Sequence, residues 1–93
     1  DYVLSFHDIN PQKKIHVLVI PKGEYKDLDD FTANASDKEI VEFSKAITHV
    51  SNLVGAKESG YRALTNLGSD GGQEVPHLHF HIFAGEKIGK MVN

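Results

Sequence analysis

Pro76-His77-Leu78-His79-Phe80-His81-Ile82-Phe83 decides the fold, because three histidines alternate in this stretch with large apolar residues. Successive side chains of a strand point to opposite faces of the sheet. We therefore expect a strand over residues 75–83 that places its three imidazoles on one face and Leu78, Phe80 and Ile82 on the core face. Residues on the same face stand about 6.6 Å apart, so neighbouring imidazoles can converge on one phosphate or one metal ion.

Two kinds of chemistry fit such a histidine cluster. A zinc site takes three neutral imidazoles, and His16, His77 and His79 would be its ligands here. Phosphate chemistry instead needs one neutral imidazole as a nucleophile, and an unperturbed histidine, with a pKa of about 6.5, is mostly neutral at pH 7. A solvated strand face is the common explanation for a single histidine, but strict alternation of three favours a site.

The loop before this strand, residues 67–72, contains three glycines, which permit positive φ angles and a close approach of the backbone to a ligand. Backbone N–H groups around Gly71, Gly72 and Gln73, with the side-chain amide of Asn66, would surround an anionic phosphate without basic side chains. Because this loop runs directly into the histidine strand, the coupling favours phosphate over zinc.

Further strands are expected over residues 1–6, 15–20 and 61–66, and a short helical turn over residues 25–31. Ser36 and Glu39 form a capping-box pattern that starts a long helix, and Gly55 ends it. The apolar residues of this helix fall at helical spacing and predict one face packed on the sheet; they are Ile40, Phe43, Ile47, Val50 and Val54. The pattern indicates an α+β domain with a mainly antiparallel meander and one long helix.

The chain of 93 residues is long enough for one domain. Its composition limits the kinds of partner that it is expected to bind. The net charge of −3 provides no basic stripe, so polymeric nucleic acid is not expected as a partner. No apolar run approaches the roughly 20 residues that cross a bilayer, so no membrane partner is expected either. The absence of cysteine excludes disulfides and thiolate metal sites and favours a cytoplasmic location. Because so small a domain buries a modest share of its surface, we expect a homodimer.

The segment His77-Leu78-His79-Phe80-His81-Ile82-Phe83 resembles the His-φ-His-φ-His-φ-φ signature of the histidine triad (HIT) family. The similarity extends over nearly the whole chain and is strongest to the Hint branch. Its other segments are Phe6-His7-Asp8-Ile9-Asn10-Pro11-Gln12, His16-Val17-Leu18-Val19-Ile20-Pro21-Lys22, Tyr61-Arg62 and Gly68-Ser69-Asp70-Gly71-Gly72-Gln73.

The resemblance implies a dimer with one nucleotide site per subunit and no cofactor. It also implies hydrolysis of purine nucleoside 5'-phosphoramidates and aminoacyl adenylates through a nucleotidyl-histidine intermediate. A purine nucleoside monophosphate, or its phosphoramidate or adenylate, would then be the small-molecule partner. Two alternatives stay open: a dinucleoside polyphosphate hydrolase, and a nucleotide-binding scaffold with little turnover.

The resemblance also assigns roles by position. His79 would be the nucleophile, His81 would contact the phosphate and the leaving group, and His77 with His16 would support them. The substrate-binding positions would be Asp8 at the ribose hydroxyls, Ile9 beside the nucleoside, and Asn66, Gly72, Gln73 and Glu74 on the phosphate side. From the residues alone, Asp8 could equally cap the turn before Pro11, Asn66 could close a strand, and Ile9 could belong to the core.

Three features depart from the family pattern. Glu74 stands where family members often carry a hydroxyl residue, and its carboxylate would repel a phosphate unless turned away. Ala84-Gly85 replaces the usual pair of glycines, which leaves the contribution of the following segment to specificity open. Family members also have a helix and a strand that would precede Asp1, so we expect a single HIT domain over residues 1–93 that lacks this N-terminal part.

Overall fold

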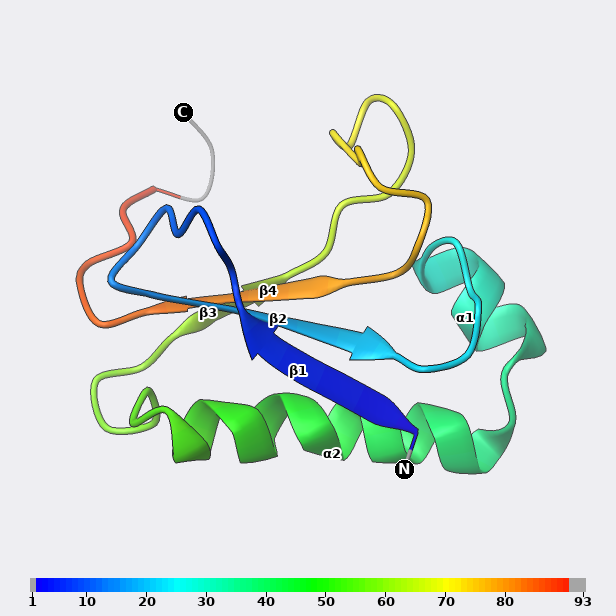
Figure 1. Cartoon of the computed structure of the whole chain (residues 1–93), viewed down its shortest axis with the longest axis horizontal. Coiled ribbons are helices and arrows are strands. Elements are labelled where there is room, and N and C mark those ends of the chain that lie inside the picture. Colours follow the sequence, from blue (N-terminus) through cyan, green and yellow to red (C-terminus); the bar gives the residue numbers. More distant parts are fainter. Residues whose placement is uncertain (1, 91–93) are drawn as a thin grey trace.

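A four-stranded antiparallel sheet and one long helix form the two layers of the protein, described for residues 2–90 in a computed structural model. The elements are β1 (Val3–His7), β2 (Ile15–Pro21), α1 (Leu28–Asn34), α2 (Asp37–Leu53), β3 (Arg62–Leu64) and β4 (Phe80–Ala84). Helix α2 runs under one face of the sheet, and the glycine-rich loop rises on the other side (Figure 1). The predicted α+β class, with an antiparallel sheet and one long helix, is confirmed.

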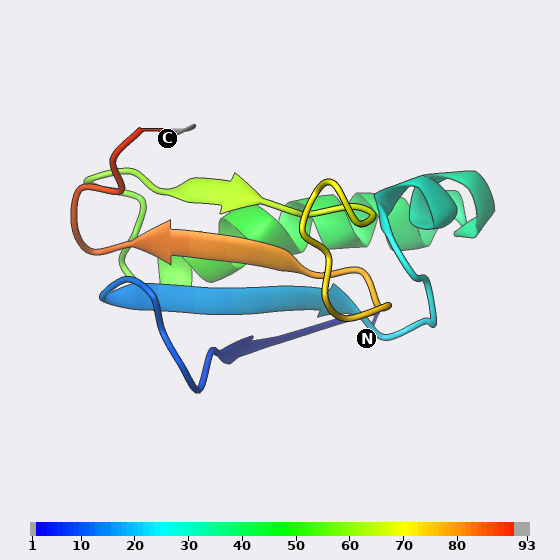
Figure 2. The same cartoon turned by 90° about the horizontal axis from the view of Figure 1, so that it is seen from above.

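The histidine-bearing strand β4 lies inside the sheet, whose order is β1-β2-β4-β3 (Figure 2). The sheet thus differs in one respect from a simple meander, because β4 separates β2 from β3. The register places His81 opposite Leu18 on β2 and opposite Leu64 on β3, and His16 opposite Phe83. Two flanking strands therefore fix the position of His81.

Helix α2 forms as its capping pattern predicts. The Ser36 hydroxyl accepts a hydrogen bond from the Glu39 N–H, and the Glu39 carboxylate accepts one from the Ser36 N–H, which completes a capping box. Gly55 follows the helix with a φ of +77°, as expected for a glycine stop. Within residues 2–90, no helix combines the length and apolar character needed to cross a membrane.

The core lies between the sheet and α2. Its buried members are Val17, Val19, Phe31, Phe43, Val50, Leu78 and Ile82. The rings of Phe31, Phe43 and Phe80 meet edge to face at centroid distances of 5.2 and 5.7 Å. As predicted, the apolar residues between the histidines face this core and the long helix covers it.

The strand predicted over residues 75–83 is wrong at its beginning, because β4 starts only at Phe80. Pro76 has no N–H to donate. The His77 N–H bonds the Val75 carbonyl, and the Leu78 N–H bonds the Tyr25 carbonyl at 2.7 Å, so neither pairs with a neighbouring strand. His77 and His79 therefore precede the strand, and only His81 lies on it.

The other elements shift at their ends. The strand expected over residues 61–66 covers only Arg62–Leu64, and the Thr65 hydroxyl bonds the His79 carbonyl at 2.7 Å instead of continuing the ladder. The turn expected over residues 25–31 begins later, because the Asp27 carboxylate caps α1 through the Asp30 N–H. Strand β1 ends at His7 rather than residue 6, and the expected first position, Asp1, lies outside the described residues.

The capping box gives a stability prediction. Replacing Ser36 by Ala should lower the free energy of unfolding by about 1 kcal/mol, because the Glu39 N–H loses its acceptor. Urea denaturation followed by circular dichroism measures this change. The matched control is Ser44→Ala in the middle of α2, where the hydroxyl bonds only the Ile40 carbonyl and alanine is the better helix former. Equal losses in the two variants would contradict the capping argument.

Candidate active site

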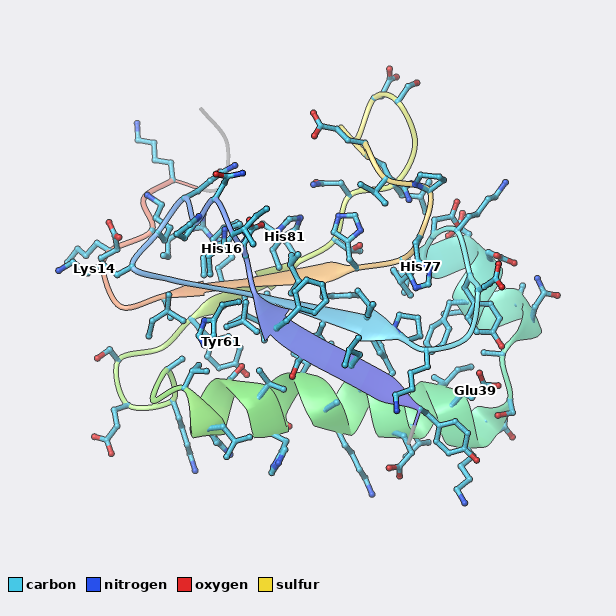
Figure 3. The ribbon with its side chains drawn as sticks, viewed as in Figure 1. Lys14, His16, Glu39, Tyr61, His77 and His81 are labelled. Carbon is cyan, nitrogen blue, oxygen red and sulfur yellow. The ribbon has the colours of Figure 1, made fainter. Side chains whose placement is uncertain are left out.

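A cleft of about 670 Å³ opens on the face of the sheet opposite α2. Figure 3 shows His16 and His81 side by side above the sheet and His77 nearer to α1. Four histidines line this cleft together with a mixture of polar and apolar side chains. The lining residues are Phe6, Asp8, Gln12, His16, Leu18, Ile20, Asn66, Gly72, Glu74, Val75, His77, His79 and His81. Histidines from β2, β4 and the preceding segment thus share one cavity.

A backbone carbonyl fixes the tautomer of His79. The Nδ1 atom lies 2.8 Å from the carbonyl oxygen of His77. A carbonyl oxygen only accepts hydrogen bonds, so Nδ1 carries the proton. In the neutral ring, Nε2 is then left with a free lone pair, which is the atom that a nucleophilic imidazole uses.

A second chain of hydrogen bonds fixes His16 and His81. The Gln12 backbone N–H donates to Nδ1 of His16 at 3.2 Å, so neutral His16 carries its proton on Nε2. That Nε2–H donates to Nδ1 of His81 at 2.9 Å. Neutral His81 must therefore carry its own proton on Nε2, as a hydrogen-bond donor. One imidazole of the site thus offers a lone pair and another offers an N–H.

Burial favours the neutral forms of His16 and His81 by lowering the pKa of both rings. Desolvation lowers the pKa of His16 from its ordinary value of 6.5, and the nearby Asp8 carboxylate, 3.5 Å from Nε2, offsets this only in part. Desolvation also lowers the pKa of His81, and the neighbouring His79 and His16 add to that effect. The contact between Asp8 and His16 is therefore an N–H to carboxylate contact at neutral pH rather than an ion pair.

Aromatic contacts support the same rings. The rings of His81 and Phe83 stack with an interplanar angle of 4°, and the centroids of His16 and Phe83 lie 4.4 Å apart. His79 meets His81 edge to face at 5.0 Å. The three imidazoles that this packing brings together are therefore His16, His79 and His81.

His77 has a different environment from the one the alternation predicts. Its Nε2 lies 3.0 Å from the Pro21 carbonyl at the end of β2, so it donates a hydrogen bond there. The ring still lines the cleft, but its proton is committed to the backbone. His77 thus ties the segment before β4 to the end of β2, while its own carbonyl orients His79.

The expectation that the loop N–H groups surround a phosphate is wrong for Gly72 and Gln73. The Gly72 N–H donates to the Ser69 carbonyl, and the Gln73 N–H donates to the Gly68 carbonyl. These bonds wind the loop on itself, so neither N–H is directed to a ligand. Within residues 2–90, no hydrogen bond to the Asn66 amide is found, and this amide lines the cleft.

Of the remaining predicted substrate-binding residues, two line the cleft and two do not. Asp8 and Glu74 line the cleft. Ile9 is 91% exposed and lies outside the lining, as does Gln73. The sequence analysis does not identify Gln12 or the apolar residues that line the cleft. Two of the apolar residues, Leu18 and Ile20, could have been found, because strand alternation places them on the same face of β2 as His16.

The group best placed to hold a metal differs from the zinc set considered above. One ligand atom each from Asp8, His16 and His81 lie within 4.8 Å of one another. A metal at Nε2 of His16 would move that ring's proton to Nδ1, where the Gln12 N–H already points. The hydrogen-bond pattern therefore opposes a metal at this position and supports the metal-free tautomers.

Comparison with known proteins agrees with this geometry. The model of the HIT domain family matches residues 1–88. The chain belongs to the HIT domain family.

A HIT-like protein of Azospirillum brasilense is 53% identical over 92 residues, which cover 99% of this chain and 75% of that protein. A purine nucleoside phosphoramidase of Escherichia coli K12 is 33% identical over 92 residues, with coverage of 99% and 76%. A HIT family hydrolase from Clostridium thermocellum superposes with a TM-score of 0.86 at 35% identity, covering 99% of this chain and 79% of that one.

The lowered pKa values of His16 and His81 predict how stability depends on pH in this HIT domain. The unfolded chain binds protons at these histidines below about pH 6.5, whereas the folded state resists protonation until a lower pH. The free energy of unfolding should therefore fall as the pH drops through 6.5 and continue to fall until the folded pKa values are reached. Urea denaturation between pH 5 and 8 measures this.

A titration of the histidine ring signals by NMR separates the contributions. Titration midpoints of His16 and His81 at or above the ordinary histidine value of 6.5 would contradict the lowered pKa values.

Proposed function

We propose that this HIT domain hydrolyses purine nucleoside 5'-phosphoramidates and related aminoacyl adenylates through a nucleotide bonded covalently to His79. One observation carries the proposal: the His77 carbonyl holds the His79 proton on Nδ1, which leaves Nε2 free to attack phosphorus. The similarity to a purine nucleoside phosphoramidase supports the choice of substrate class.

The reaction has two steps. In the first, the Nε2 lone pair of His79 forms a bond to the α-phosphorus, and the bond from phosphorus to the leaving group breaks with its electron pair. An amine leaving group takes up a proton from water as it departs, whereas an acyl oxygen leaves as a carboxylate. The nucleotidyl ring is then positively charged because Nδ1 keeps its proton, and the His77 carbonyl stabilises that charge. In the second step, water displaces Nε2 from phosphorus, which releases the nucleoside monophosphate and one proton to the solvent and restores neutral His79.

The neighbouring groups bind the substrate in this proposal. The Nε2–H of His81 and the Asn66 amide donate hydrogen bonds to phosphoryl oxygens, without a charged side chain. Asp8 accepts hydrogen bonds from the ribose hydroxyls. The apolar part of the cleft, which includes Phe6, Leu18 and Ile20, receives the nucleoside. Ile9 and Gln73 have no direct contact in this assignment, because neither lines the cleft.

We propose that two such domains form a homodimer. Strand β3 is at one edge of the sheet, and within residues 2–90 it pairs only with β4. Tyr61, which directly precedes β3, remains partly exposed, and Leu53 at the end of α2 is largely exposed. An unpaired strand edge and exposed apolar side chains both favour association with a second copy.

The proposal predicts that His79→Ala loses nearly all turnover of adenosine 5'-phosphoramidate, by at least about a thousandfold in kcat, while affinity for adenosine monophosphate changes far less. The variant keeps the donors around the phosphate and loses only the nucleophile. Release of ammonia measures turnover, and calorimetric titration measures binding. The matched control is His49→Ala on the exposed side of α2, which should behave like the wild type.

The same assay separates the alternatives. A chelator that abolishes turnover would contradict the metal-free mechanism. Faster turnover of a dinucleoside polyphosphate than of either proposed substrate would identify the protein as a dinucleoside polyphosphate hydrolase. Binding of the monophosphate without turnover of any substrate would identify a binding protein.

The role of Asp8 gives a separate prediction about binding. The wild type should bind adenosine monophosphate about 10- to 100-fold more tightly than its 2',3'-dideoxy analogue, as expected for hydrogen bonds to a charged acceptor. Asp8→Ala should lose this preference, because the analogue already lacks both hydroxyls. Calorimetric titration of the two ligands into both proteins tests it. A preference that survives in Asp8→Ala would show that another group contacts the ribose.

A further inference from the structure

The glycine-rich loop beside the cleft, residues 67–72, is exposed along its whole length. Its two backbone hydrogen bonds, from Gly72 to Ser69 and from Gln73 to Gly68, hold only its own shape. At Gly71 the loop folds back closely on the backbone of Leu67, because a Cβ there would clash with the Leu67 carbonyl oxygen. The loop is therefore a compact unit whose placement over the cleft must come from elsewhere.

The side-chain amide of Gln73 supplies that placement. Its Oε1 accepts a hydrogen bond from the Gly68 N–H at 3.0 Å. Its Nε2 donates to the carbonyls of Lys26 at 2.5 Å and Val75 at 3.0 Å. Among the described residues, the bonds to Lys26 and Val75 are the only hydrogen bonds that connect this loop unit to another part of the chain. One carboxamide thus joins the start of the loop, the segment before α1 and the segment before β4.

The segment before α1 holds the histidine segment as well. The Leu78 N–H donates to the Tyr25 carbonyl, next to the Lys26 carbonyl that Gln73 uses. The Tyr25 hydroxyl in turn donates to the Glu39 carboxylate in the first turn of α2 at 3.0 Å. Two adjacent carbonyls therefore set the positions of the loop and of the histidine segment relative to each other.

The direction of the Gln73 side chain separates this role from substrate contact. Its chain neighbours Gly72 and Glu74 both line the cleft, whereas Gln73 lines a separate depression of about 460 Å³ with Lys26, Gly68 and Pro76. We infer that Gln73 is a positioning residue, which holds the glycine-rich loop and Asn66 at the correct distance from the nucleophile. Its kinetic consequence rests on the function proposed above, but its structural consequence does not.

Two substitutions of nearly equal length test the inference. Gln73→Glu keeps an acceptor for the Gly68 N–H but removes both donors and turns a carboxylate toward two carbonyls. Gln73→Met removes all three bonds. Both should lower kcat for adenosine 5'-phosphoramidate by roughly 10- to 100-fold with KM changed less than about threefold, because a displacement near 1 Å costs this much when binding groups remain. Ser69→Asp places a negative charge in the same loop without removing a side-chain hydrogen bond and should leave kcat unchanged.

Hydrogen exchange measured by NMR gives a readout that is independent of activity. The Gly68 amide should exchange faster in Gln73→Met and remain protected in Gln73→Glu, because only the glutamate keeps its acceptor. If the wild type shows no turnover, the proposed function fails, while this exchange pattern still tests the tether. Wild-type kcat in both variants at a temperature where they are folded would overturn the positioning role, even with a lower melting temperature. Unchanged Gly68 exchange in Gln73→Met would overturn the tether itself.

Discussion

The hydrogen bond from Nδ1 of His79 to the carbonyl of His77 is the interaction on which the account of this protein depends. It joins residues two apart in sequence, so it needs no distant partner, but it does need a backbone that turns this carbonyl toward the ring. A β-ladder would direct successive carbonyls sideways toward neighbouring strands. The irregular segment before β4 is therefore a requirement of the chemistry. Pro76, the Leu78 bond to Tyr25 and the Thr65 bond to the His79 carbonyl all maintain it.

The order of the sheet provides the second requirement. Because β4 lies next to β2, the His16 and His81 rings meet on the face that α2 leaves open. A chain of two hydrogen bonds runs from the Gln12 backbone N–H to His16 and from His16 to His81, which leaves an N–H donor on His81. Burial favours the neutral form of both rings. The site can thus receive a phosphate with neutral N–H groups. Within residues 2–90, no lysine or arginine lines the cleft.

Local patterns in the sequence predict the parts of the structure that depend on local interactions. The capping box of α2 and its apolar face are visible because residues three and four apart carry them. Alternation predicted that Leu78, Phe80 and Ile82 face the core and that His79 and His81 belong to one site. The beginning of β4 was not predictable in this way, because it depends on a bond to Tyr25, which is far away in the sequence.

The same limit explains the errors at the site. The bond from His77 to Pro21 spans 56 residues, and the bond from Gln73 to Lys26 spans 47. Nothing in either local pattern indicates such a partner, so the sequence predicts His77 in one cluster with its neighbours and Gln73 among the phosphate donors. The loop N–H groups were misassigned for a related reason: a glycine-rich sequence predicts freedom of the backbone but not which carbonyl each N–H will meet.

The chemical position of the trapped nucleotide tests the central claim most directly. Wild-type protein mixed with adenosine 5'-phosphoramidate, quenched within milliseconds and analysed by phosphorus and nitrogen NMR and by peptide mass spectrometry, identifies the atom that carries the nucleotide. The hydrogen bond from His79 to His77 predicts an adduct on Nε2 of His79. An adduct on Nδ1 of that ring, or on another histidine, would contradict the account.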